Sequence, residues 1–306
     1  MKSAVLIVNA LVVLVAMGMF ANAQTREIIV DGQNAPEWNQ WLGVTATRGS
    51  CNLPPEGCMQ QVEALLKSQH TRHFYMNLWD DKDPQSILDR ATYYSNASLS
   101  EPRLYEVGID DFTDHFNNWC VMSAIRCDSF LGEVIAAVKS QNKALKFGLT
   151  LYEDQLPSLL ANRRFTPALR NQIDTVHMVL HQRQNGPQFE SYVNEVKHKF
   201  PNAQVIAASY HYDRIDYVKC GGVRCSAAQE LDFYKQTLKL QLTLLQQGVV
   251  SGIEFYPGYF GWEEKWPSWD NPKVCSPARK QDCIDNMKAM DQATLQLFKE
   301  FGIGSH

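Results

Sequence analysis

The alternation that decides the fold is plainest in three apolar runs in the second half of the chain: LKFGLTLY at residues 145–152, TVHMVLH at 175–181 and QVIAASYHY at 204–212. Each run contains residues that favour strands, and a helix-favouring stretch at 187–200 separates the last two. Strands that alternate with helices pair in parallel and carry the helices on the outside of the sheet. The stretch therefore predicts an α/β protein.

The same order extends in both directions along the chain. Further strands are expected at 41–47, 73–79, 103–110 and 252–256, and further helices at 59–69, 84–93, 129–141, 227–247 and 282–300. Seven units without a break in composition favour a (β/α)8 barrel of the TIM type, formed by a single domain at 24–306. The eighth strand is expected at 28–30 or at 301–303, or else the eighth unit is irregular. An open doubly wound sheet is the alternative, although no Gly-rich nucleotide-binding turn follows the first strand.

Residues 1–23 differ from the rest of the sequence. Lys2 precedes the apolar run 4–20, and Ala21-Asn22-Ala23 has the small-x-small pattern of a cleavage site. This arrangement is typical of a secretory signal peptide, so we expect a secreted protein, either extracellular or periplasmic. An uncleaved membrane anchor is the alternative. No later apolar run has the length of a membrane span, and stable membrane insertion is not expected after cleavage.

Eight cysteines in an exported chain predict disulfide bonds. They form four close couples, which are Cys51 with Cys58, Cys120 with Cys127, Cys220 with Cys225, and Cys275 with Cys283. We expect sequence neighbours to pair, and each short loop to contribute roughly 2–3 kcal/mol. A zinc site is the alternative, but no couple has the tight CxxC spacing that zinc sites use. No metal or other cofactor is expected.

The composition and charge of the chain exclude several classes of function. The 306 residues are 45% hydrophobic with a formal charge of −4, which indicates a folded protein without the basic surface that nucleic-acid binding requires. No GxSxG turn is present, and all the cysteines are expected in disulfides. Nucleic-acid partners and Ser or Cys nucleophiles are therefore not expected.

In a barrel of this type, functional residues lie at the C-terminal ends of the strands. Alternation along each strand indicates which side chains point inward. The inward-facing or strand-terminal polar residues are Asn77, Asp110, Asp111, Glu153, Asp154, His181, His211, Asp213, Glu254 and Tyr256. So many carboxyl groups at one rim favour a catalytic role, because buried carboxylates are costly unless they are paired.

Glu254 is the most specific of these signals, because it lies between the apolar residues Ile253 and Phe255. Its structural alternative is a buried ion pair with Arg or His from a neighbouring strand. Glu153 and Asp154 have a simpler alternative, since acids that follow a strand often cap the next helix.

The seven tryptophans are expected at strand ends or in loops, and three of them, Trp262, Trp266 and Trp269, follow the Glu254 strand closely. Aromatic rings above an acidic rim suit sugar rings, so Trp79 and Trp262 are expected to contact a carbohydrate substrate. The structural alternative is that the tryptophans pack the disulfide-bearing loops together.

The paired carboxylates, the aromatic rim and the expected export resemble those of the retaining (β/α)8 glycoside hydrolases. The resemblance is one of architecture and of two residues. In that family an acid/base Glu ends the fourth strand and a nucleophile Glu ends the seventh, and the predicted strands give these places to Glu153 and Glu254. The family usually has Asn before the acid/base Glu, whereas Tyr152 stands here, which leaves Asp154 or Asp110 as alternative acids.

The resemblance implies a secreted glycosidase that cleaves a poly- or oligosaccharide with two carboxyl groups. In this scheme Glu254 is the nucleophile or its stabilising counterpart, and Tyr256 orients it. The residues expected to bind sugar hydroxyls are Asn77, His181, His211 and Asp213. Two other functions remain open. One is a metal-dependent sugar isomerase, epimerase or phosphodiesterase with Glu153, His211, Asp213 and Glu254 as ligands. The other is a non-catalytic carbohydrate-binding barrel.

Overall fold

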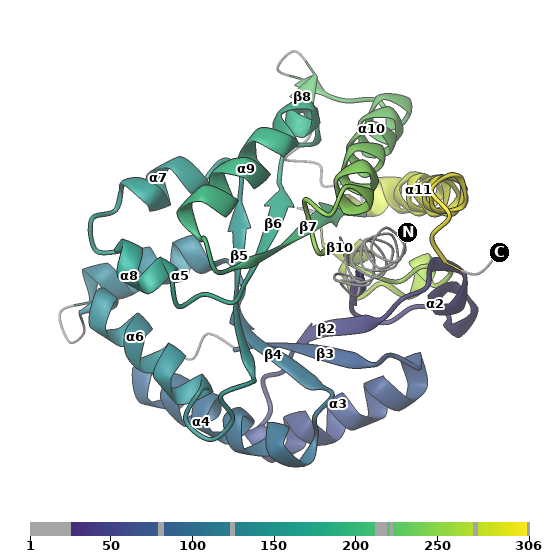
Figure 1. The fold of residues 1–306 in the computed structure, drawn as a ribbon. Coiled ribbons are helices and arrows are strands. Elements are labelled where there is room, and N and C mark those ends of the chain that lie inside the picture. The colour runs from purple at the N-terminus through teal and green to yellow at the C-terminus, as the bar shows by residue number, and fades with distance from the viewer. Residues whose placement is uncertain are drawn as a thin grey trace, which may run out of the picture.

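Eight parallel strands close into one barrel within the part of the chain that this computed structural model describes, which comprises residues 26–78, 83–122, 126–211, 219–220, 223–271 and 275–304. The strands are β1 (Glu27–Asp31), β2 (Ala46–Ser50), β3 (His73–Asn77), β4 (Leu104–Ile109), β5 (Lys146–Tyr152), β6 (Thr175–Leu180), β7 (Gln204–Tyr210) and β10 (Gly252–Tyr256). They are ordered β1-β10-β7-β6-β5-β4-β3-β2 around the barrel (Figure 1). The expected (β/α)8 fold class is confirmed.

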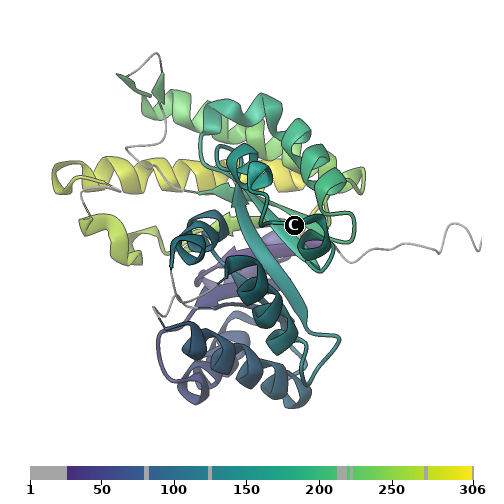
Figure 2. The ribbon, with the colours of Figure 1, turned by 90° about the vertical axis from the view of Figure 1, so that its left-hand side faces the viewer.

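Helices surround the barrel, as Figures 1 and 2 show. They are α2 (Pro36–Leu42), α3 (Pro55–Gln69), α4 (Pro84–Ser100), α5 (Phe112–Val121), α6 (Cys127–Val138), α7 (Leu156–Ala161), α8 (Pro167–Arg170), α9 (Phe189–Lys199), α10 (Ala227–Gln246) and α11 (Lys280–Glu300). A small hairpin, β8 (Lys219–Cys220) and β9 (Val223–Arg224), precedes α10. None of the described helices combines the length and the apolar character that a bilayer crossing requires. The expected leader at 1–23 lies outside the described residues.

Of the first two strands, β1 lies at one of the two places expected for the eighth strand, whereas β2 differs from the expectation. The strand expected at 41–47 is divided between the end of α2 and the start of β2, and residues 28–30 lie in β1, which pairs with both β10 and β2. Pro36 at the first helical position and the buried Trp38 and Leu42, spaced four residues apart, explain why this segment is helical. Glu153 therefore follows the fifth strand, and Glu254 lies in the eighth.

Alternation places the side chains of most strands as expected. On β5, Phe147, Leu149 and Leu151 pack in the outer core, whereas Thr150 and Tyr152 line the cavity of the barrel. On β7 the alternation that would bring His211 inward, and with it Ser209, is wrong by one residue. Tyr210 lines the cavity, and the side chain of Ser209 points outward and donates a hydrogen bond to Gln241 on α10 at 2.8 Å. The run Ala207-Ala208-Ser209 has too little contrast in polarity to fix which face is buried.

The four disulfides join the expected sequence neighbours, and no described cysteine is free. The expectation that all tryptophans lie outside helices is wrong. Trp38 and Trp41 belong to α2, and Trp119 belongs to α5. Trp269 is buried with Cys275 and Cys283, so this tryptophan packs against the disulfide of its loop, as the structural alternative supposed.

Candidate active site

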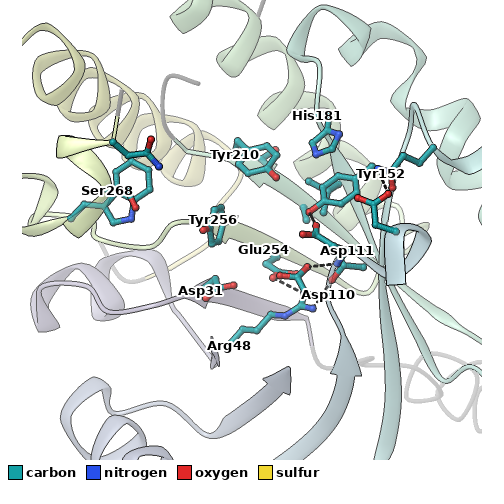
Figure 3. A pocket seen from close by; sticks show the side chains of 18 residues that line it. Asp31, Arg48, Asp110, Asp111, Tyr152, His181, Tyr210, Glu254, Tyr256 and Ser268 are labelled. Carbon is teal, nitrogen blue, oxygen red and sulfur yellow. Dashed lines mark hydrogen bonds and ion pairs between the residues drawn. The ribbon is translucent and has the colours of Figure 1, made fainter. Parts of the chain in front are cut away.

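A cavity of about 390 Å³ opens at the C-terminal ends of the barrel strands (Figure 3). Polar groups from several strands line it. Asp31 comes from β1, Arg48 from β2, Thr150 from β5 and Glu254 from β10. Asp110 follows β4 and belongs to the same wall. The cavity therefore gathers residues that are distant in sequence at the end of the fold where active sites of such barrels lie.

Arg48 forms the floor of this cavity with Glu254. Its Nη1 donates to both carboxylate oxygens of Glu254, at 2.9 Å to Oε1 and 3.2 Å to Oε2. Its Nε donates to Asn77 Oδ1 at 2.9 Å, and its Nη2 donates to Thr150 Oγ1 at 2.5 Å. Arg48 and Glu254 are each 3% exposed, so the ion pair is shielded from solvent. The buried pair that was the structural alternative for Glu254 is thus present.

His177 of β6 provides a second cationic partner for Glu254. Its Nδ1 lies 2.5 Å from Glu254 Oε2, and its Nε2 lies 2.8 Å from Oε1 of Glu106 on β4. His177 and Glu106 lie below the cavity in the barrel interior, and neither was predicted from the sequence to have a role. Their inward positions follow from strand alternation, but the ion pair itself depends on the closure of the barrel.

These partners keep Glu254 ionised. Burial alone raises the pKa of its carboxyl group, but Arg48 and then His177 outweigh burial and lower the pKa to about 2. The pKa of His177 responds in the opposite direction. Burial lowers it, whereas Glu254 and Glu106 raise it to about 9. Glu254 is therefore a carboxylate at neutral pH, and it faces the cavity from below.

Asp31 is a candidate site residue that the sequence analysis missed. It is the last residue of β1 and lines the cavity, two residues beyond Ile29, whose Cα is the register partner of Glu254. Removal from water raises the pKa of Asp31 to about 8, with Glu254 and Asp110 as further causes, although Arg48 opposes the shift. At neutral pH Asp31 is therefore a neutral carboxylic acid beside an ionised glutamate. Figure 3 shows the two side chains at the same cavity.

Asp110 and Asp111 follow β4 at the rim. Asp110 is half-buried, and its Oδ1 accepts a hydrogen bond from the backbone N–H of Asp111 at 3.0 Å. The hydroxyl of Tyr152 donates to Oδ1 of Asp111 at 2.5 Å. Together with Asp114, these residues make the wall formed by β4 and α5 acidic.

Glu153 lies outside the cavity. It is 2% exposed, and its oxygens accept hydrogen bonds from the backbone N–H groups of His181 at 2.7 Å and Gln182 at 2.9 Å, and from Asn185 Nδ2 at 3.3 Å. Burial raises the pKa of Glu153, although these hydrogen bonds oppose the shift. The structure thus places the expected general acid directly after β5, where its carboxylate stabilises the backbone of the loop that follows β6.

The other sequence-predicted residues are divided between the cavity and its surroundings. His181 and Tyr256 line the cavity, and the His181 ring stacks on Tyr152 with centroids 3.6 Å apart. Asp154 pairs with His181 Nδ1 at 3.2 Å. Asn77 lies beneath, where it binds Arg48. Trp79 and Asp213 fall outside the described residues.

His211 and Trp262 lie away from the cavity. His211 is buried on the outer side of β7, where its ring stacks on Phe260 and its Nε2 lies 2.5 Å from Asp291 Oδ1. The indole of Trp262 is covered by Lys265, whose Nζ lies 3.9 Å from the ring centroid. Trp266 of the same loop lines the cavity instead, and it packs edge-on against Trp269.

The metal-ligand set considered from sequence is not brought together, because Glu153, His211 and Glu254 lie in three separate environments. Among the described residues, one group could present metal ligands within 4.8 Å of one another, and it consists of Glu153, Asp154 and His181. In that group both oxygens of Glu153 already accept backbone hydrogen bonds.

No protein-family model and no curated protein matches the chain. Solved structures do match it. A glucosidase from Croceicoccus marinus aligns over 89% of this chain and 68% of its own, with 11% identity and a TM-score of 0.59. The catalytic domain of a chitinase from Pyrococcus furiosus aligns over 92% and 97%, with 11% identity and a TM-score of 0.54. An exo-β-1,4-mannosidase from an Opitutaceae bacterium aligns over 88% and 60%, with 10% identity and a TM-score of 0.54. The chain therefore has the barrel fold found in glycoside hydrolases.

Proposed function

We propose that this protein is a secreted glycoside hydrolase whose catalytic pair is Asp31 and Glu254. One observation carries the proposal. Two carboxyl groups line the same cavity, and their surroundings shift their pKa values in opposite directions, to about 8 for Asp31 and about 2 for Glu254. Glycosidic cleavage needs one carboxylic acid and one carboxylate, which is the pair that such opposite shifts produce. The glycosidase fold of the structural neighbours agrees with this chemistry.

Each residue has a distinct task in this mechanism. Asp31 gives its proton to the oxygen of the leaving sugar as the glycosidic bond breaks. Glu254 faces the positive charge that develops on the sugar ring, and it acts as the nucleophile or as an ionic stabiliser. Its Oε1 accepts one hydrogen bond, from Arg48, so one lone pair remains for the substrate. Asp110, Tyr210, Tyr256 and Trp266 surround the sugar with hydroxyl acceptors and aromatic rings.

The proposal replaces the expected acid Glu153 with Asp31 and keeps Glu254. It also keeps the expected export, because four disulfides are typical of an oxidising compartment. We propose that a leader at residues 1–23 directs this export and that its removal leaves a mature domain at 24–306.

The test is hydrolysis of a panel of oligo- and polysaccharides by the wild type, Asp31→Asn and Glu254→Gln. Because Asp31 is neutral at pH 7, asparagine preserves its charge and shape and removes only the proton donor. We expect Asp31→Asn to keep its fold, by circular dichroism, and to lose about 10²–10⁴-fold in kcat/KM. Wild-type activity should fall above about pH 8, as Asp31 ionises.

The matched control is Glu153→Gln, which alters a buried carboxyl group outside the cavity. Full activity of Asp31→Asn would disprove the assignment of the acid. Loss of wild-type activity on addition of a chelator would favour the metal-dependent alternative. Binding of sugars without turnover by any variant would favour the non-catalytic barrel.

A further inference from the structure

His177 is held between two carboxylates in the middle of the barrel. Its Nδ1 lies 2.5 Å from Glu254 Oε2, and its Nε2 lies 2.8 Å from Glu106 Oε1. The imidazole has no exposed surface, and Glu106 and Glu254 are 2% and 3% exposed. Both ring nitrogens therefore have a carboxylate oxygen as a hydrogen-bond partner, with little access for water.

This geometry determines the protonation of the ring. A neutral imidazole has one N–H and one lone pair, so it could donate to only one of the two carboxylates. Its lone pair would then face the other oxygen. An imidazolium donates to both. With Arg48 it also balances the charge of the network, because two cations meet two anions.

The place of Glu106 is built into the barrel. Its carboxyl group occupies the space beside Gly148 on β5, where a Cβ atom would lie 2.0 Å from Oε1 of Glu106. On β4 itself, Gly108 approaches the backbone of Gly148 so closely that a Cβ atom would lie 2.8 Å from its carbonyl oxygen. Gly148 thus makes room for a carboxylate that does not line the cavity, and Gly108 lets the two strands approach each other at this place.

The groups around His177 come from every neighbouring part of the barrel. Glu106 and Glu254 contact the ring nitrogens, and the ring of Tyr75 on β3 meets the imidazole edge-on, with centroids 5.7 Å apart. Arg48 and Asp31 lie beyond Glu254. Loss of the proton from His177 would leave two carboxylates with Arg48 as their one cation. Burial makes such an unbalanced charge costly, so the proton is retained.

We infer that His177 is a positioning residue that remains an imidazolium across the working pH range, and that Glu106 holds it in this state so that Glu254 stays ionised and fixed in orientation. The inference rests on the proposed function, since it concerns the same site. The inference adds that Glu106, which does not line the cavity, controls the charge of Glu254, which does.

The first test is independent of activity. In protein labelled with ¹⁵N-histidine, NMR should show one buried imidazole with both nitrogens protonated and no titration between pH 6 and pH 8. In Glu106→Gln the same ring should titrate within this range, because the amide keeps a hydrogen-bond acceptor but carries no charge. A neutral His177 in the wild type at pH 7 would overturn the inference.

The second test uses the pH dependence of hydrolysis. Ionisation of Asp31 is expected to set the alkaline limb of the wild type near pH 8. Glu106→Gln should add a decline of kcat at lower pH, where His177 then titrates, with little change in KM. The matched control is Glu27→Gln. Glu27 also pairs with a histidine inside the barrel, its Oε1 lying 3.2 Å from Nδ1 of His73, but that pair is at the opposite end. The control should lose stability and keep the wild-type pH profile.

The outcomes separate the two proposals. An unchanged pH profile in Glu106→Gln, with a lower melting temperature alone, would reduce Glu106 to a structural role and overturn the inference. A wild type that hydrolyses no sugar would disprove the proposed function, and the NMR titration of His177 would still decide the protonation of the buried network.

Discussion

Asp31 and Glu254 illustrate how the position of a carboxyl group in a barrel determines its chemistry. Glu254 lies one layer deeper, within reach of Arg48 and His177, which keep it ionised. Asp31 lies at the end of β1, where removal from water and then the ionised Glu254 disfavour a negative charge on its carboxyl group. The sequence reveals Glu254, because an acid between Ile253 and Phe255 breaks an apolar strand. Asp31 gives no such signal, because it ends a short strand where polar residues are common.

Glu153 shows why a strand-terminal acid is an ambiguous signal. From sequence it is equivalent to a catalytic acid, because both would follow an apolar strand. The structure shows that its oxygens satisfy backbone N–H groups in the next βα loop. Only the path of that loop, which the sequence does not specify, separates the two roles.

The role of Glu153 can be measured by Glu153→Gln. The amide can accept through only one atom, so at least one buried N–H of His181 or Gln182 loses its acceptor. We expect a loss of about 1–3 kcal/mol in the free energy of unfolding, measured by chemical denaturation. The shape of the pH–activity profile should not change. A lost acidic or alkaline limb would instead return Glu153 to the catalytic machinery.

At the scale of elements, six of the eight barrel strands could be predicted from apolar runs bounded by turns. The other two are β1 and β2. The segment between them contains Trp38, Trp41 and Leu42, whose apolar character suggests a strand. A helix forms instead, because Pro36 occupies its first position and the buried Trp38 and Leu42 are spaced four residues apart. Because β1 at 28–30 is one of two places expected for the eighth strand and is not counted as the first strand, the expected correspondence of Glu153 and Glu254 to the fourth and seventh strands is wrong.

The loop that follows β10 gives a prediction for one disulfide. Cys275–Cys283 packs with Trp269, which in turn contacts the cavity residue Trp266. Replacing both cysteines by alanine should destabilise the protein by about 2–3 kcal/mol and also weaken substrate binding, seen as a higher KM. The control is the double alanine variant of Cys120 and Cys127, a disulfide of similar loop length between α5 and α6. An equal rise in KM in both variants would contradict the role of the Trp266 wall.

For the whole molecule, the buried ionisable groups predict greatest stability in mild acid. The raised pKa of His177 gives stability that is complete below about pH 6.5 and is lost as the pH rises through about 9. Asp31, whose pKa is raised from 3.8 to about 8, gives stability that is complete below about pH 4 and is lost as the pH rises through about 8. Glu254 contributes above about pH 4.5 and loses its contribution toward pH 2.

Melting temperatures measured across pH should therefore peak near pH 5 and fall toward pH 9. Asp31→Asn should make the decline between pH 5 and pH 8 less steep, because the amide does not ionise in either the folded or the unfolded state. A melting temperature that rises steadily from pH 5 to pH 9 would contradict the assigned shifts.

The barrel closes where its first strand meets its last, β1 against β10. Arg48 and Glu254, which form the floor of the cavity, are 206 positions apart, and Asp31 and Glu254 belong to the two strands of this seam. A growing chain cannot bring Asp31 and Glu254 together until Gly252–Tyr256 has been synthesised and has docked, so every shorter product of translation lacks the proposed pair. Contacts of such long range also form late and slowly, which delays the appearance of activity until the molecule is otherwise folded. Under the proposed function, export of the chain before this strand docks would keep the proposed hydrolytic site unassembled inside the cell.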